Sequence, residues 1–172
     1  MDMVLILGFV TLQRLAELVV AHRNTTRLLA RGAWEAGREH YPYMVALHAL
    51  WLAGLWWLAP GRPVSPALLG VYVLLQGLRT WIVASLGDRW TTRIIILPGA
   101  PLVRRGPYRF ISHPNYTVVV AEIAVLPLMF GLVGYAVLFF VLNAAVLYVR
   151  IRDENRALGI APSPAAGAGG AQ

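Results

Sequence analysis

Long apolar blocks, separated by short arginine-rich segments, dominate this chain of 172 residues. Hydrophobic residues make up 58% of the chain and charged residues only 13%, whereas a soluble domain typically carries about 25% charged residues. A helix needs about 20 residues to cross the hydrocarbon core of a bilayer, and the apolar blocks have or approach that length. The pattern therefore predicts an all-α integral membrane protein.

About five transmembrane helices are predicted. They cover residues 3–21, 42–60, 66–86, 115–130 and 133–149. Because only a few residues separate the last two blocks, we expect them to form a C-terminal helical hairpin. The first block follows the acidic Asp2 and has no clear cleavage site, so it is interpreted as a retained helix and not as a signal peptide. A single domain is expected over residues 1–160, with a disordered Pro/Ala/Gly-rich tail over 161–172.

The basic residues predict the orientation in the membrane. All 15 of them are arginines, and the formal net charge is +7. The segments after the first, third and fifth blocks hold four, five and three arginines, whereas the other two connections hold only Arg62. The positive-inside rule then places the N-terminus outside and the C-terminus inside a bacterial-type cytoplasmic membrane. We accordingly expect membrane lipids, and not nucleic acid, as the partners of this charge.

The absence of cysteine from the sequence narrows the chemistry. It excludes a disulfide framework, a thiolate zinc site and a cysteine nucleophile. His40, Met44 and His48 recur at a spacing of four, which indicates one face of a helix. Because no third ligand shares that face, helix packing or an interfacial role is favoured, and no metal is expected.

The long connection between the third and fourth blocks contains a β-branched run. The isoleucines at 94–96 precede the turn residues Pro98-Gly99-Ala100-Pro101, and Leu102 and Val103 form a second short run. A run, a turn and a run predict a small hairpin within residues 91–103, lying at the membrane interface.

Ionisable side chains inside the predicted spans are costly, so each is a candidate functional residue. Arg14 and Glu17 are three residues apart and can pair on one face of the first helix. The pair is either a structural lock to the rest of the bundle or part of a functional site. Arg79, in the third block, is expected to extend towards the basic face of the membrane.

The last two predicted helices carry polar stripes. Asn115 and Glu122 are seven residues apart, about two helical turns, and so share a face. Asn143, Arg150 and Glu154 return to within roughly 20° of one direction on the last helix. This stripe descends from the middle of the bilayer to the cytoplasmic surface and marks Arg150 and Glu154. The alternative is an ordinary solvated helix end with i,i+4 pairing.

Two segments resemble a known family. Gly106-Pro-Tyr-Arg-Phe-Ile-Ser-His-Pro-Asn-Tyr116 is similar to the G-x-Y-x-x-x-R-H-P-x-Y signature of the isoprenylcysteine carboxyl methyltransferase family, membrane enzymes that use S-adenosylmethionine. Arg150-Ile-Arg-Asp-Glu154 resembles that family's second motif, an arginine followed at short range by glutamate. The resemblance covers about residues 97–158, and the runs at 38–42 and 89–93 are similar to a small bacterial branch.

The resemblance implies an S-adenosylmethionine-dependent methyltransferase with a cytoplasmic cofactor-binding loop, its cofactor-binding part lying at about residues 87–158. The residues implied in cofactor binding are Tyr108, Arg109, His113, Pro114, Asn115, Tyr116 and Glu154. Arg150 and Glu154 are the implied catalytic residues, and Glu122 and Asn143, on the polar stripes, are candidates for substrate binding. Ser112 stands where the family usually has arginine, so we expect Arg109 or Arg105 to supply the missing cation.

The implied acceptor is lipophilic and enters from the bilayer. It is a prenylated cysteine carboxylate or, as for some small bacterial relatives, the hydroxyl of a long-chain alkylpyrone or alkylresorcinol. A second function left open is an NADPH-dependent reductase similar to the sterol-reductase-like membrane proteins, although the sequence lacks a Gly-rich phosphate loop. A third is a small transporter or a non-enzymatic membrane subunit, and the lack of repeats or paired broken helices counts against transport.

Overall fold

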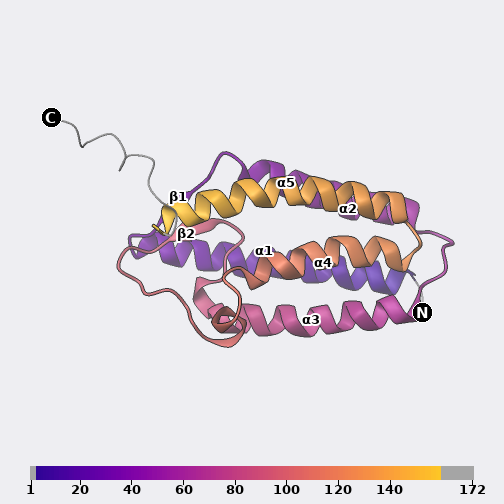
Figure 1. Cartoon of the computed structure of the whole chain (residues 1–172), viewed down its shortest axis with the longest axis horizontal. Helices are drawn as coiled ribbons and strands as arrows, with labels where there is room; N and C mark the ends of the chain where they lie inside the picture. Colours follow the sequence, from indigo (N-terminus) through magenta and orange to yellow (C-terminus); the bar gives the residue numbers. More distant parts are fainter. Residues whose placement is uncertain (1–2, 160–172) are drawn as a thin grey trace, which may run out of the picture.

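The computed structural model describes residues 3–159, so the predicted tail at 161–172 lies outside the described part. The helices run side by side along the long axis of the molecule (Figure 1). They are α1 (Met3–Ala30), α2 (Tyr41–Leu58), α3 (Pro66–Leu86), α4 (Pro114–Met129) and α5 (Val133–Ala157). The bundle is therefore built from the five predicted helices, with two of them longer than their apolar blocks.

Local capping signals explain the helix boundaries that the sequence predicts best. Ser65 precedes α3, and its side-chain oxygen accepts a hydrogen bond from the backbone N–H of Leu68, while Pro66 occupies the first turn, where a missing N–H costs nothing. Gly87, at φ 55°, ends the same helix in a conformation that glycine adopts without strain. By contrast, α1 continues past residue 21 because its polar end still buries one face, including Asn24 and Leu28.

Among residues 3–159, three helical stretches are long and apolar enough to cross a membrane: α1, Pro66–Arg89 and α5. The helix α4 is apolar but shorter, and α2 carries a histidine and three tryptophans among its 18 residues. Large apolar side chains such as Leu12, Leu74 and Val141 are exposed along the bundle, as expected for surfaces that contact lipid. The described part is that of an integral membrane protein, and the count of five membrane-crossing helices stays a prediction.

The two short strands pair across a long sequence separation. Strand β1 (Trp34–Ala36) is antiparallel to β2 (Ile94–Ile96), with Glu35 opposite Ile95. The predicted hairpin within residues 91–103 is therefore wrong, because the isoleucine run pairs with the segment after α1 and not with Leu102 and Val103. Arg93, directly before β2, forms an ion pair with Glu35 of β1 at 2.8 Å and so stabilises the pairing of the strands.

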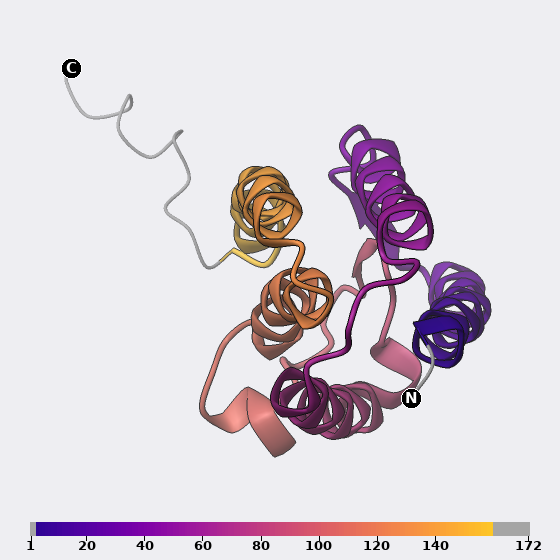
Figure 2. The same ribbon diagram turned by 90° about the vertical axis from the view of Figure 1, so that its right-hand side faces the viewer.

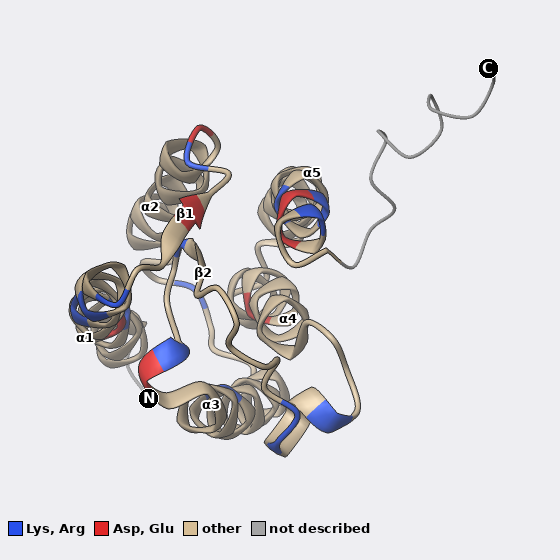
Figure 3. Cartoon of the chain, turned by 90° about the vertical axis from the view of Figure 1, so that its left-hand side faces the viewer, with Lys and Arg blue, Asp and Glu red and all other residues tan. Residues whose placement is uncertain are grey.

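The three arginine-rich segments lie at one end of the bundle. The ends of α1, α3 and α5 and the starts of α2 and α4 meet there, together with both strands and two 3-10 helices, η1 (Gly87–Arg89) and η2 (Gly106–Arg109). Figure 3 looks onto this basic end, with the arginines in blue. Which side of a membrane it faces stays a prediction.

The other end of the bundle holds an apolar core. Figure 2 views the molecule from there, with α4 between α3 and α5. The buried side chains that fill this core include Leu7, Val10, Trp51, Leu55, Leu126, Met129 and Phe130. Buried polar side chains, among them Arg79, Glu122, Asn143 and Arg150, lie outside this apolar core.

Candidate functional site

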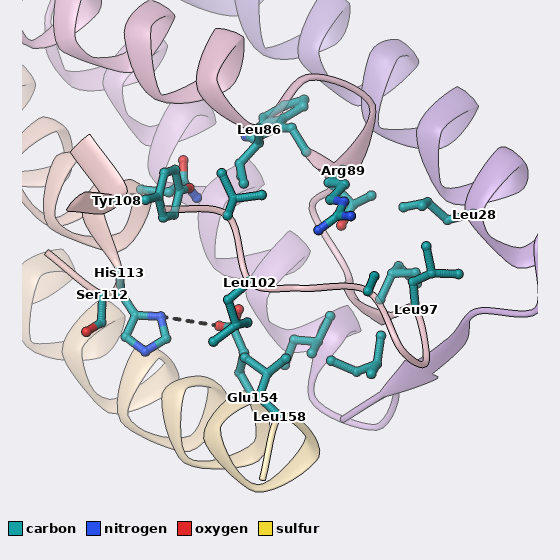
Figure 4. A pocket seen from close by; sticks show the side chains of 18 of the residues that line it. Leu28, Leu86, Arg89, Leu97, Leu102, Tyr108, Ser112, His113, Glu154 and Leu158 are labelled. Carbon is teal, nitrogen blue, oxygen red and sulfur yellow. Dashed lines mark ion pairs between the residues drawn. The ribbon is translucent and has the colours of Figure 1, made fainter. Parts of the chain in front are cut away.

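A cavity of about 660 Å³ lies at the basic end of the bundle (Figure 4). Its apolar wall combines Leu28 from α1, Leu86 from α3, and Leu97 and Leu102 from the connection between α3 and α4. Its polar wall comes from the start of α4 and the end of α5. The residues of the polar wall are Ser112, His113, Asn115, Tyr116, Arg150 and Glu154. The cavity thus joins a lipid-like surface to a cluster of hydrogen-bonding groups.

Three side chains tie α5 to α4 at the polar wall. The Tyr116 hydroxyl donates to Glu154 Oε2 at 2.5 Å and accepts from Arg150 Nε at 2.9 Å. Arg150 is buried, and its Nη2 also donates to the backbone oxygen of Thr92 at 2.7 Å. The predicted stripe on α5 therefore faces the motif on α4, and Arg150 fixes both to the loop that carries β2.

His113 and Asn115 complete this wall. His113 lies just before α4, with Nε2 3.1 Å from Asn155 Oδ1 and Nδ1 3.6 Å from Glu154 Oε2 (Figure 4). Its ring stacks on that of Tyr116, the centroids 5.4 Å apart. The Asn115 Oδ1 atom is buried and has no hydrogen-bond partner among the described residues. A buried acceptor of this kind calls for a donor, so the wall suits a ligand with N–H or O–H groups.

The 3-10 helix η2 brings Tyr108 and Arg109 to the cavity. Gly106, at φ 57°, lies so close to Ser85 that an added Cβ would clash with its hydroxyl, and Arg105 Nε donates to the backbone oxygen of Ser85 at 2.7 Å. These contacts hold η2 against the end of α3. Burial raises the pKa of the Tyr108 phenol, and the Glu154 carboxylate raises it further, so this hydroxyl stays protonated.

The contacts of η2 distinguish between Arg105 and Arg109, the two candidates to replace the family arginine that is absent at Ser112. Arg105 is engaged with the end of α3 and is not part of the cavity wall, whereas Arg109 lines the cavity with an exposed side chain. Of the two residues that the sequence suggested, the geometry favours Arg109.

Arginines exceed acids on the cavity wall. The arginines are Arg89, Arg93, Arg104, Arg109 and Arg150, and Glu154 is the acid among the lining residues of the described chain. Arg93 is held by Glu35 and lies over the Tyr41 ring, 4.3 Å from its centroid. Arg89 donates to the backbone oxygen of Pro101 at 2.5 Å. The positive excess suits a ligand that brings negative charge.

Three of the predicted site residues do not line the cavity. Pro114 is buried in the first turn of α4, where it sets the start of the helix. Asn143 is 1% exposed, and neither amide atom has a partner among residues 3–159. Glu122 is also 1% exposed and belongs to a network of charges in the middle of the bundle. The structure thus brings the predicted cofactor residues other than Pro114 to the cavity wall, whereas Glu122 and Asn143 are buried between the helices.

The charged network confirms the expected Arg14–Glu17 pair and corrects the expected direction of Arg79. Arg14 and Glu17 form the predicted pair at 2.9 Å. Arg79 does not extend towards the basic face, because its Nε and Nη2 donate to Glu17 at 2.5 and 2.6 Å and its Nη1 donates to Glu122 at 3.0 Å. Sequence reasoning missed this arrangement since the partners of Arg79 lie on other helices.

His40, at the N-cap of α2, and His48, within that helix, each lie against a nearby backbone oxygen, and His40 Nε2 is also 3.8 Å from Asp153 Oδ2 on α5. His40 Nδ1 is 2.8 Å from the Gly37 oxygen, and His48 Nδ1 is 2.8 Å from the Met44 oxygen. Within residues 3–159 no three histidines, aspartates or glutamates gather in a way that could hold a metal ion.

The comparison with known families is decisive for the class of protein. The model of the isoprenylcysteine carboxyl methyltransferase (ICMT) family matches residues 68–160, more than half of the chain. The chain belongs to the ICMT family. Both motifs and the whole polar wall of the cavity fall inside the matched range, and family membership implies a membrane methyltransferase.

Two relatives cover most of the chain. The uncharacterized protein YpbQ of Bacillus subtilis is 36% identical over 167 residues, which span 90% of this chain and 95% of that protein. An uncharacterized protein of Haemophilus influenzae is 23% identical over 151 residues, which span 84% of this chain and 88% of the relative. No solved structure matches the chain. Because 90% of this chain is covered, the likeness to the Bacillus protein extends in front of residue 68, where the range of the family model begins.

Proposed function

We propose that this ICMT-family protein uses S-adenosylmethionine to O-methylate a lipophilic acceptor. The observation that carries the proposal is the polar wall, where His113, Asn115 and Tyr116 on α4 meet Arg150 and Glu154 on α5. This wall borders a cavity that also has an apolar side, as a lipophilic acceptor requires.

The residues present fit the proposed cofactor. S-adenosylmethionine has a sulfonium, an amino-acid end and two ribose hydroxyls. Glu154 and the unpartnered Asn115 Oδ1 would accept from its hydroxyls or amino group, and Arg109 would present a guanidinium fork to its carboxylate. The described cavity wall therefore offers acceptors for the hydroxyls or the amino group of this molecule and a cation for its carboxylate.

Bound there, S-adenosylmethionine would supply an electrophilic methyl group to an oxygen of the acceptor. The task of the chain is to hold donor and acceptor in line and to exclude water. Arg150 serves this by fixing the Tyr116 hydroxyl and the Thr92 backbone at once. Tyr108 stays protonated because its pKa is raised, so it acts as a hydrogen-bond donor and not as a base.

The acceptor that the cavity suits best carries an ionised oxygen and a long apolar tail. Isoprenylcysteine carboxylate meets this description, as does the acidic hydroxyl of a long-chain alkylpyrone; an alkylresorcinol is the less acidic alternative. The arginine excess favours the anion, and an oxygen that is already ionised needs no general base. Leu28, Leu97 and Leu102 would contact the tail. We place the basic end, and with it this site, on the cytoplasmic side.

Methyl transfer from radiolabelled S-adenosylmethionine tests the acceptor. Detergent-purified protein would be supplied with a prenylated cysteine analogue, an alkylpyrone and an alkylresorcinol of matched chain length. We expect label in at least one of the first two products and least in the alkylresorcinol. A folded protein that labels none of them contradicts the proposed acceptor classes.

A membrane NADPH-dependent reductase is the second candidate. The observation in its favour is the arginine-rich cavity wall, because phosphate groups are bound by arginine. The two cofactors are distinguished by direct binding: NADPH would depend on Arg89 and Arg104, whereas S-adenosylmethionine would depend on Glu154.

A further inference from the structure

Four charged side chains from three helices meet in the middle of the bundle. Arg14 and Glu17 come from α1, Arg79 from α3 and Glu122 from α4, and their side chains are between 1% and 21% exposed. Gln13 and Gln76 join α1 to α3 beside them, at 2.6 Å. Two positive and two negative charges make this mid-bundle network neutral.

Glu122 is where α4 is attached to this network. Its carboxylate accepts from Arg14 Nη2 at 2.7 Å, from Arg79 Nη1 at 3.0 Å and from Gln76 Nε2 at 2.8 Å. A buried charge is tolerated only while its partners stay in place. Rotation or sliding of α4 would therefore break three hydrogen bonds from two other helices.

The network lies close to the cofactor residues along the same helix. Glu122 is seven residues from Asn115, which is about 10 Å along the helix axis and about two turns, so both lie on one face. Apolar contacts between helices give little preference for one register inside a membrane, because lipid tails are as apolar as the side chains. Polar bonds to Glu122 can supply the preference that apolar packing does not.

We propose that the mid-bundle network is a positioning device for the cofactor site. Glu122, Arg14 and Arg79 set the depth and rotation of α4, and thereby place Asn115 and Tyr116 opposite α5. The proposal rests on the proposed function for its ligand but not for its geometry. It also makes α1, which lies outside the family-matched range, part of the same catalytic unit.

The cysteine-free sequence allows the geometry to be measured without the ligand. Thr26 on α1 and Thr117 on α4 are exposed, so Thr26→Cys and Thr117→Cys can carry a spin label each. We expect a narrow distance distribution, and Glu122→Gln should broaden or shift it. The same substitution should raise the Kd of S-adenosylhomocysteine, the product of the proposed reaction, by about tenfold.

A compensating substitution separates positioning from a general loss of stability. Adding Arg14→Gln to Glu122→Gln removes one charge of each sign, and we expect it to restore much of the narrow distribution and of the affinity. Tyr148→Phe, at an exposed side chain of α5, is the control that should change neither quantity. If Glu122→Gln does not fold, Gln76→Met removes one bond to Glu122 without changing charge, and should broaden the distribution while weakening binding by about threefold.

The proposal is overturned if folded Glu122→Gln, or Gln76→Met in its place, keeps the parent distance distribution and a Kd within twofold. A parent protein that does not bind S-adenosylhomocysteine would contradict the proposed function instead. In that case the spin-label distances alone decide whether the network positions α4.

Discussion

Arginine occupies two contrasting environments in this molecule. In the mid-bundle network, Arg14 and Arg79 are bound to carboxylates at 2.5 to 3.0 Å. On the cavity wall, Arg104 and Arg109 are exposed and form no ion pair with any described residue. The first pair holds helices together, and the second pair is available to a ligand. Arg14 and Arg79 therefore have a structural role, whereas we propose a binding role for the solvated Arg104 and Arg109.

The largest effect is expected from breaking the mid-bundle network. Arg79→Met leaves Glu17 and Glu122 short of a positive partner, and removing one member of a buried ion pair costs about 3–5 kcal/mol. Thermal unfolding in detergent should show this loss. Arg104→Gln, on the exposed cavity wall, is the matched control and should leave stability unchanged; equal effects of the two substitutions would remove the contrast between the two environments.

Next in size is the loss of the carboxylate on the polar wall. Glu154→Gln removes the charged acceptor of the Tyr116 hydroxyl, and a hydrogen bond to a charged group contributes about 1.5–3 kcal/mol. The Kd for S-adenosylmethionine should rise about 10- to 100-fold, as isothermal titration calorimetry would report. Asp153→Asn, one residue earlier on the same helix, should bind almost normally, and comparable losses in both would argue against a specific role for Glu154.

A smaller loss is expected at the exposed arginine of η2. Arg109→Ala should weaken S-adenosylmethionine binding about tenfold, because a charge-assisted bond to the cofactor carboxylate is lost. Unfolding temperature should not change, in contrast to Arg79→Met. Arg105→Ala is the informative comparison: a greater loss of affinity there would assign the role of the missing family arginine to Arg105.

The smallest effect concerns Tyr108. Because its pKa is raised by burial and by Glu154, the phenol is protonated throughout the neutral range, and Tyr108→Phe should leave the shape of the pH–rate profile unaltered. A raised pKa also means that the folded state keeps this proton longer than the unfolded state, so stability should fall as pH rises above about 10. A profile whose alkaline limb disappears in Tyr108→Phe would show that the phenol does titrate during turnover.

Most of the fold prediction rested on residues that act within their own stretch of sequence. The boundaries of α3 follow from Ser65, Pro66 and Gly87, all of which act on their own neighbourhood. The pairing of β1 with β2 could not be predicted in the same way, because Glu35 and Ile95 are far apart in the sequence. The hairpin expected within residues 91–103 rested on neighbouring residues only, namely a β-branched run, a turn and a second short apolar run.

In the candidate site, too, local patterns were predictable and contacts between distant segments were not. Helical spacing placed Arg150 and Glu154 on one stripe, and the structure brings that stripe to Tyr116. The predicted direction of the Arg79 side chain was wrong. A guanidinium near a helix end can extend to the surface or turn to a buried partner, and the partner Glu122 lies on another helix. Sequence patterns thus identify which residues share a face, whereas partners across helices require the structure.

Direct cofactor binding tests the central claim. Detergent-purified protein would be titrated with S-adenosylmethionine and, separately, with NADPH, alongside Glu154→Gln and with the fold monitored by circular dichroism. We expect the parent protein to bind S-adenosylmethionine at one site per chain, Glu154→Gln to bind it far more weakly, and NADPH to bind neither protein. A folded parent that binds NADPH and not S-adenosylmethionine would contradict the methyltransferase assignment of this site.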